Sequence, residues 1–304
     1  MAFKDRIEPV LLKKLRILNT RMEMTEDDRK YYLNQEKGYE GEVQFDSMTE
    51  KLQSECYILN DLLLKVFNTT FQIDTILLFQ DTIYLIDVKS FEGEYCYDKD
   101  SFHTRSGRER KNPLHQLNRG KSLFRQLLQE LGYQTKVEAY AIFINPEFTL
   151  YQAPPDLPFI LPTQLQRFLK KLDSNPSQLK PHHKKLAEKL RSLHQSESSY
   201  YSLPPYEYDQ LKKGLTCKSC KSFLVSLLGK HVVCGECGCK ELIESSVIHC
   251  IEEYILLFPN RKITTREICE WCNLYKSKRT IIRILNRNFK VVRSGRSTQY
   301  EPKD

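Results

Sequence analysis

The sequence predicts an α/β fold whose core is a mixed β-sheet. Apolar runs of strand length stand at 59–67, 71–79, 82–89 and 137–144, and their β-branched and aromatic residues favour strands. Apolar residues at helical spacing over 113–131 separate the last run from the first three. An order of helix, three or four antiparallel strands, helix and strand is typical of an α/β core.

The N-terminal part of the chain predicts helices. Residues 1–20 form a basic amphipathic stretch, for which packing is the ordinary role, and residues 25–37 predict an exposed polar helix. Gly38 and Gly41 bracket a turn into a further helix that carries Glu42. Taken alone, Glu42 fits a helix N-terminal acid that complements the helix dipole.

The run at 82–89 predicts a buried strand with two charges at its end, Asp87 and Lys89. Side chains two apart share one face of a strand, and burying such charges costs free energy unless the site uses them. A two-residue link joins this run to the preceding one, which holds Asp74. The resulting hairpin is expected to bring Asp74 close to Asp87.

The segments that follow complete the first predicted domain. Residues 91–102 predict another hairpin, and residues 106–112 predict a basic loop, either solvated or in contact with phosphate. Pro113 suits the first turn of a helix that Gly132 ends. Two more helices are expected, around 165–172 and 184–193.

The motifs of this domain resemble those of a known family. Asp74, a dozen residues and then Asp87-x-Lys89 resemble the catalytic core of the PD-(D/E)xK nuclease superfamily. With Gly38–Tyr39–Glu40–Gly41–Glu42 upstream and Asn112–Pro113–Leu114–His115–Gln116–Leu117 downstream, residues 38–150 resemble the nuclease-related domain NERD. One departure is Asp87, where the family more often has Glu.

The resemblance implies a restriction-endonuclease-like fold with a metal-dependent nuclease site. It implies that Asp74, Asp87 and the Val88 carbonyl bind Mg²⁺ or Mn²⁺, whose preferred ligands are oxygen atoms. Glu42 would hold a water on the metal or a second metal. Lys89 would orient the water or neutralise the phosphate, and Gln116 would position the helix or a water.

Two classes of function follow from this resemblance. The first is a DNA nuclease, and the alternative is a non-catalytic DNA-binding or regulatory protein that retains the nuclease fold. A weaker alternative is that the acids only form buried ion pairs.

Four cysteines form a second pattern. Two C-x-x-C knuckles, thirteen residues apart, have the spacing of a structural Zn²⁺ site in a zinc ribbon. Cys239 and His231 are spare ligands, whereas Cys269 and Cys272 fit packing in a helix. The predicted zinc ligands are Cys217, Cys220, Cys234 and Cys237.

The tail predicts three helices and a two-stranded hairpin, an order that resembles a winged helix-turn-helix. Thr264 begins a capping box, and 277–288 is the candidate recognition helix. Eleven Lys and Arg residues stand between Arg261 and Arg296, although a basic face also serves solubility or protein docking. The residues expected to contact DNA are Lys278, Arg279, Arg283, Arg293 and Arg296.

Composition and segmentation complete the prediction. The net charge of +8 favours a polyanionic partner. No apolar run is long enough for a membrane span, no secretory signal is evident, and ten cysteines without one indicate a reducing, cytoplasmic location. The expected segments are a nuclease domain (1–195), a linker (196–210), a zinc ribbon (211–244) and a winged-helix-like domain (245–304).

Overall fold

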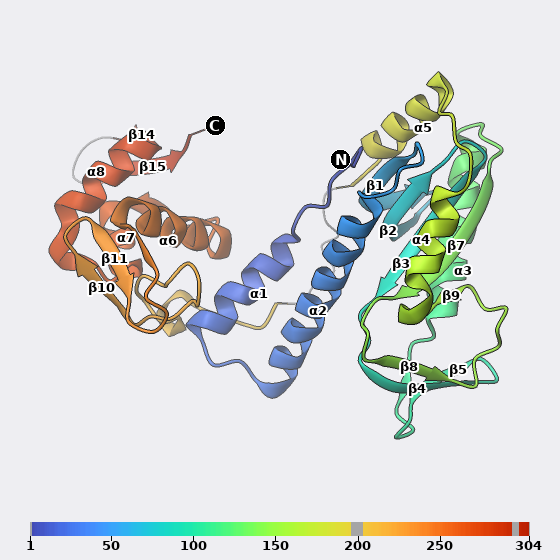
Figure 1. Ribbon diagram of the computed structural model, residues 1–304. Coiled ribbons are helices and arrows are strands. Elements are labelled where there is room, and N and C mark those ends of the chain that lie inside the picture. Colours follow the sequence, from blue (N-terminus) through green and yellow to red (C-terminus); the bar gives the residue numbers. More distant parts are fainter. Residues whose placement is uncertain (1, 196–202, 294–297, 304) are drawn as a thin grey trace. The chain divides into compact units, whose positions relative to one another are not determined.

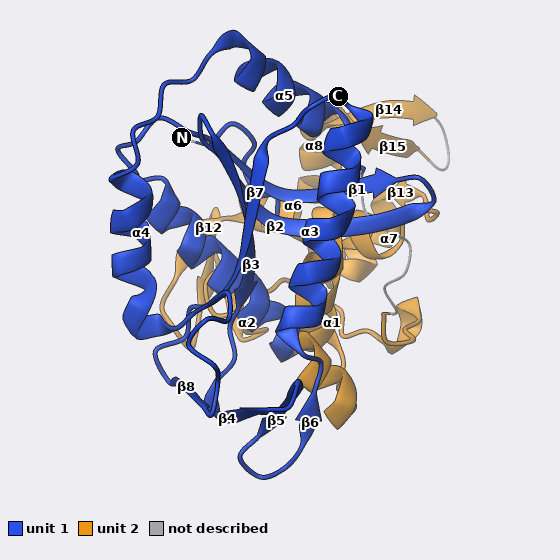
Figure 2. Cartoon of the chain, turned by 90° about the vertical axis from the view of Figure 1, so that its right-hand side faces the viewer, with its two compact units in different colours: residues 1–8, 33–201 blue, residues 9–32, 202–304 orange. Residues whose placement is uncertain are grey.

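The computed structural model describes residues 2–195, 203–293 and 298–303. They form two compact units, which Figure 2 shows in different colours. Unit 1 comprises residues 1–8 and 33–201, and unit 2 comprises residues 9–32 and 202–304. The chain therefore passes to unit 2 just before α1 (Val10–Arg21) and returns to unit 1 within α2 (Glu26–Thr49), between residues 32 and 33. It passes to unit 2 again between the described residues 195 and 203.

Unit 1 is built on a five-stranded mixed sheet of order β1-β2-β3-β7-β9. The first three strands are antiparallel, and β7 and β9 continue the sheet in parallel. The predicted α/β class is therefore confirmed. The strands are β1 (Tyr57–Val66), β2 (Thr69–Leu78), β3 (Thr82–Lys89), β7 (Lys136–Phe143) and β9 (Phe159–Ile160).

Helices cover both faces of this sheet (Figure 1), and each face has its own apolar core. Residues of α3 and α5 pack against one face, and residues of α2 and α4 pack against the other. The side chain of Asn112 caps α3 by accepting a hydrogen bond from the Leu114 N–H, with Pro113 at the first helical position. The helices are α3 (Pro113–Glu130), α4 (Leu165–Asp173) and α5 (Pro181–Ser192).

One sequence-based expectation about α2 is wrong. The turn predicted at Gly38 and Gly41 is absent, because α2 runs without interruption through both glycines. A β-carbon on Gly41 would lie 3.1 Å from both Ser90 and Ile144. Gly41 thus allows close approach of the helix to the ends of β3 and β7, which brings Glu42 toward the end of the sheet.

A second, smaller sheet of order β6-β5-β4-β8 follows β3. The predicted hairpin at 91–102 is its β4–β5 pair, and the basic loop after it includes the short strand β6. Its aromatic side chains join the core beside Phe143, whose ring lies 4.2 Å from that of Phe148. The strands are β4 (Gly93–Asp98), β5 (Ser101–Thr104), β6 (Glu109–Arg110) and β8 (Phe148–Tyr151).

Unit 2 contains two small antiparallel sheets, with strand orders β10-β11-β12 and β13-β15-β14, and the helices around them. Thr264 caps α7, as predicted, by accepting a hydrogen bond from the Glu267 N–H. The helices are α6 (Ile243–Leu257), α7 (Thr265–Trp271) and α8 (Lys278–Asn288). The strands are β10 (Val225–Leu228), β11 (His231–Cys234), β12 (Lys240–Leu242), β13 (Ile263–Thr264), β14 (Phe289–Arg293) and β15 (Gln299–Pro302).

Helix α1 belongs to unit 2, whereas the sequence grouped all of residues 1–195 together. The reason is Arg21, whose side chain is buried and donates to Glu253 Oε2 at 2.9 Å and to the Lys212 carbonyl at 2.8 Å. Its guanidinium also lies 4.3 Å from the Trp271 ring. In the predicted linker, 196–202 lie outside the described residues, and Tyr208 is buried within unit 2.

Candidate functional site

Three of the predicted site residues form a closed set of contacts where β3 ends and α3 begins. Lys89 Nζ donates to Asp87 Oδ1 at 2.9 Å, and Gln116 Nε2 donates to the same oxygen at 3.1 Å. Lys89 Nζ also donates to Gln116 Oε1 at 3.1 Å. The two-residue period of the strand places the first two side chains together, and the first turn of α3 supplies the third.

Asp74 lies beside this group, as the predicted hairpin requires. The β2–β3 register pairs Thr75 with Ile86, which sets Asp74 next to Asp87 across the two strands. Asp74 Oδ2 accepts a hydrogen bond of 2.8 Å from the Val88 N–H. The sheet therefore holds two carboxylates and one ammonium group at one end of β3.

Glu42 reaches the same region from α2 and contacts a residue that the sequence did not single out. Arg6 Nη1 donates to Glu42 Oε2 at 2.6 Å, and Arg6 Nε donates to Asp46 Oδ2 at 2.8 Å. Arg6 Nη2 also donates to the Asp74 carbonyl at 2.8 Å. Asp46 lies one helical turn after Glu42, and residues four apart share one face of a helix. This spacing was the sequence signal that could have identified Asp46 as a site residue.

Burial gives these acids an unusual proton affinity. It raises the pKa of Asp87 to about 7, against the opposing effect of Lys89 and with a further contribution from Asp74. Burial and the neighbouring Asp74 raise the pKa of Glu42 to about 8, although Arg6 opposes this shift. Burial also raises the pKa of Asp74, while Lys89 and the Val88 N–H oppose it. Several buried carboxylates close together favour the approach of a cation.

The donor set of this site fits a hard divalent cation. Asp87 Oδ2 is buried 2.8 Å from Lys89 Nζ, but no described donor gives it a hydrogen bond of suitable geometry. The oxygens of Asp74, Asp87 and the Val88 carbonyl are of the class that Mg²⁺ and Mn²⁺ prefer.

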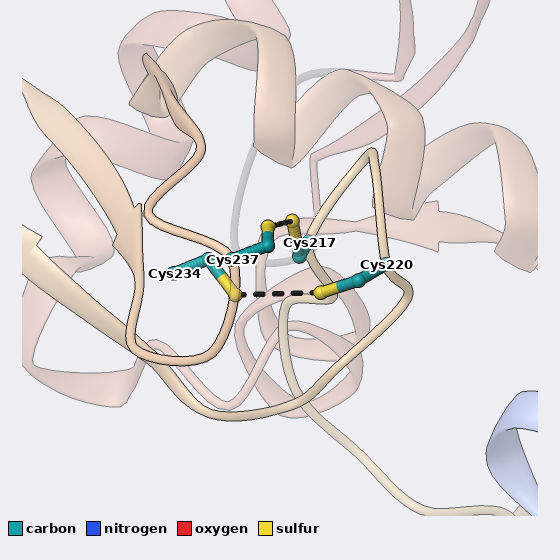
Figure 3. Close-up of side chains that lie close together, drawn as sticks. All are labelled: Cys217, Cys220, Cys234 and Cys237. Carbon is teal, nitrogen blue, oxygen red and sulfur yellow. Dashed lines mark hydrogen bonds between the residues drawn. The ribbon is translucent and has the colours of Figure 1, made fainter.

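The four predicted cysteines converge in unit 2 (Figure 3). Their sulfur atoms all lie within 4.8 Å of one another, and the Cys217–Cys237 and Cys220–Cys234 pairs lie at 3.5 Å. Four sulfurs at about 2.3 Å from a tetrahedral zinc ion stand about 3.8 Å apart. Among the described residues, this is the group of His, Cys, Asp and Glu side chains whose ligand atoms meet this closely.

The backbone of both knuckles supports the cluster. The Lys221 N–H bonds to the Cys217 carbonyl and the Gly238 N–H to the Cys234 carbonyl, so both knuckles turn in the same way. Burial opposes ionisation of Cys217, yet N–H donors and neighbouring thiols lower the pKa of its thiol to about 6. A lowered thiol pKa favours the thiolate that a metal binds. Although the Ser222 N–H opposes the shift, desolvation and the neighbouring thiols raise the pKa of the Cys220 thiol to about 12, so the lowered pKa is not shared by all four thiols.

The remaining cysteine and histidine predictions are resolved by burial and contacts. Cys239 accepts a hydrogen bond from Ser219 Oγ at 3.3 Å and stands outside the cluster, as does His231 on β11. Cys269 and Cys272 are buried in the core of unit 2, as the packing interpretation predicted.

The predicted basic residues of the tail lie on exposed positions where the structure describes them. Lys278, Arg279 and Arg283 of α8 are exposed, as is Arg293 of β14, and Arg296 lies outside the described residues. The sequence predicted that Ile281, Ile282 and Leu285 of this helix face the core. Ile281 and Leu285 are buried there, but Ile284 is buried in place of Ile282, which is only half-buried.

Comparison with known protein families matches the part of the chain that holds this site. Residues 37–144 match the model of the NERD family, which is described as a nuclease-related domain. The match includes all five predicted catalytic residues and leaves out Arg6. No curated protein and no solved structure matches the chain. No helix in the described part of the chain is long and apolar enough to cross a membrane.

Proposed function

We propose that this chain is a metal-dependent nuclease that hydrolyses phosphodiester bonds in DNA. The observation that carries the proposal is the contact set of Asp87, Lys89 and Gln116, with Asp74 and Glu42 beside it, inside a nuclease-related domain. Incubation with single-stranded DNA, duplex DNA and RNA in Mg²⁺, Mn²⁺ or EDTA tests it.

In this proposal Asp74, Asp87 and the Val88 carbonyl hold one Mg²⁺ or Mn²⁺ ion. The bound ion would lower the pKa of the attacking water and stabilise charge on the phosphate. Lys89 orients that water or neutralises the phosphate in the transition state. Gln116 contacts both Asp87 and Lys89, and so fixes the direction of each side chain.

The raised pKa values predict how acidity and metal affect stability. The folded protein keeps protons on Asp87 and Glu42, whose pKa values of about 7 and 8 exceed the ordinary 3.8 and 4.5. The metal-free free energy of unfolding therefore falls as pH rises through this window, by at most about 1.4 kcal/mol per pH unit for each proton. A divalent ion binds the ionised acids, so Mg²⁺ should raise the melting temperature more at pH 8 than at pH 6.

Thermal melts of the full chain with Mg²⁺ or EDTA at both pH values check this. Asp87→Asn should reduce the Mg²⁺ effect and flatten the pH dependence. An Mg²⁺ effect that is equal at both pH values, or unchanged in Asp87→Asn, would contradict the assignment of the ion to these acids.

The cysteine cluster is proposed to bind one structural Zn²⁺ ion in a zinc ribbon. Four protein sulfurs leave no open position for a substrate, which is typical of a structural site.

The tail is proposed to be a winged helix that binds DNA. Its order of helix, strand, helix, helix and two strands supports this, with β13 pairing to β15 at the edge of the sheet. On α8, the buried Ile281, Ile284 and Leu285 face the core, and the basic residues lie on the exposed face. Arg293 is exposed at the last residue of β14, in the hairpin that would form the wing.

DNA affinity is expected to depend on this exposed face of α8. In the full chain, Arg279→Ala with Arg283→Ala should weaken duplex binding and reduce the salt slope by about 2, because each phosphate contact releases about one counterion. Fluorescence anisotropy at several salt concentrations measures both quantities.

The control is Arg287→Ala, which removes a basic residue of the same helix that pairs instead with Glu244 at 3.3 Å. Full affinity and an unchanged salt slope in the Arg279 and Arg283 double variant would favour a protein-docking role for the tail.

The alternative function, a non-catalytic DNA-binding or regulatory protein, is favoured by one feature. Asp87 is a methylene shorter than the Glu that the family more often has, so its carboxylate reaches less far. Binding without cleavage of any substrate in Mg²⁺ or Mn²⁺ would favour this alternative.

A further inference from the structure

The guanidinium group of Arg6 is buried between α2 and β2, directly beside the acids of the proposed site. Its side chain is only 4% exposed. Nη1 and Nε donate to Glu42 and to Asp46 Oδ2, as described above. The third nitrogen, Nη2, donates to the Asp74 carbonyl at 2.8 Å and to the other carboxylate oxygen of Asp46, Oδ1, at 3.1 Å. The planar fork of Arg makes such contacts in several directions at once, which an ammonium group does not.

The backbone fixes Arg6 in this place. Phe3 and Lys4 lie along the edge of β1, where the Phe3 N–H bonds to the Ile58 carbonyl and the Asn60 N–H bonds to the Lys4 carbonyl. Lys4 Nζ also donates to the carbonyl oxygens of Asn60 and Asp61 at 2.7 and 2.8 Å. The segment is therefore attached to the sheet two residues before Arg6, and the guanidinium is held in position before any ligand binds.

The charges of the site are matched by one divalent ion. When the four acids Glu42, Asp46, Asp74 and Asp87 are all ionised, as a bound ion requires, the cations Arg6 and Lys89 oppose them, so 4 − 2 leaves two negative charges. A fifth acid, Asp61 of β1, lies close to the ammonium group of Lys4, which donates a hydrogen bond to the Asp61 backbone carbonyl. A second divalent ion would need Glu42 as a ligand, but the Arg6 cation already lies 2.6 Å from that carboxylate. Two cations so close repel each other.

We propose that Arg6 is a positioning residue that takes the place of a second metal ion, so that the site holds one ion. Glu42 is then directed by Arg6 toward the attacking water, and it is no metal ligand. This inference rests on the proposed nuclease function and decides between the two roles that the family resemblance leaves open for Glu42.

Counting bound Mn²⁺ tests the inference without any measurement of cleavage. On the zinc-loaded full chain, electron paramagnetic resonance and calorimetric titration should give one Mn²⁺ ion in the wild type. Glu42→Gln should still bind one ion, with a Kd within about threefold of the wild type. Arg6→Ala should bind two ions, and Arg6→Ala combined with Glu42→Gln should return the number to one.

Two further variants separate positioning from folding. Lys65→Ala removes an exposed cation elsewhere on β1, and should bind one ion with unchanged affinity. Arg6→Lys keeps the charge but not the fork, so it should bind one ion while kcat falls and KM stays constant. Glu42→Gln should lower kcat by about 10²-fold, as expected for a group that acts on water.

The outcomes distinguish this inference from the function on which it rests. Two Mn²⁺ ions in the wild type, or a large loss of Mn²⁺ affinity in Glu42→Gln, would overturn the inference and leave the nuclease proposal standing. No Mn²⁺ binding by the wild type would overturn both. If Arg6→Ala fails to fold, the Glu42→Gln titration still decides, because Arg6 is intact in that variant.

Discussion

Asp87→Asn is expected to lower divalent-dependent DNA cleavage by about 10³-fold or more, since a metal ligand and its charge are lost together. Lys89→Ala should have a similar effect, because it removes the cation that faces the phosphate. Neither variant should unfold the protein. Asn keeps an oxygen at the position where Lys89 and Gln116 donate, 2.9 and 3.1 Å from Asp87 Oδ1.

The stability of Asp87→Asn provides a second measurement. Since burial raises the pKa of Asp87 to about 7, its carboxylate is ionised at pH 8 at a cost to the folded state. The neutral amide avoids that cost, so the metal-free melting temperature at pH 8 should stay the same or rise. A purely structural ion pair would give the opposite result, because a broken buried pair destabilises.

Asp81→Asn is the matched control, because the same chemical change falls on an exposed acid between β2 and β3. It should cleave like the wild type. Equal cleavage by the wild type, Asp87→Asn and Lys89→Ala would identify the activity as a contaminant.

The sequence alone predicted the part of the site that local geometry controls. The period of two in the last strand of the hairpin places Asp87 and Lys89 together, and the two-residue link sets the register that brings Asp74 beside them. Gln116 came only from the family resemblance, which places a polar residue near the start of that helix. The contacts among Asp74, Asp87 and Lys89 lie within one strand pair, whereas Gln116 reaches Asp87 and Lys89 from α3.

No sequence pattern pointed directly to Arg6, because its partners are 36 to 69 residues away along the chain. Its position depends on how Phe3 and Lys4 attach to β1, which no periodic pattern reveals. The continuous α2 helix was missed for a similar reason. Gly41 looks like a turn residue in sequence, whereas in the structure its missing side chain allows close packing against Ser90.

Cys217→Ser and Cys234→Ser are each expected to remove the zinc ion from the purified chain. Structural zinc sites bind with apparent free energies of about 10–16 kcal/mol, and most of that is folding free energy in a small ribbon. Elemental analysis should find one zinc per wild-type chain and close to none in either variant. Cys239→Ser is the matched control, because the Cys239 sulfur lies outside the cluster. This variant should keep one zinc ion per chain.

The effect on folding should be confined to unit 2. Val232 of β11 is buried in the same core as Val247, Tyr254 and Trp271, so loss of the ribbon opens one side of that core. The core of unit 1 is separate. Hydrogen exchange should therefore show lost protection over β10–β12 and α6 in Cys217→Ser, with protection of β1–β3 unchanged. Full zinc content in both variants, or unchanged protection of β11, would show that these cysteines do not hold a structural metal.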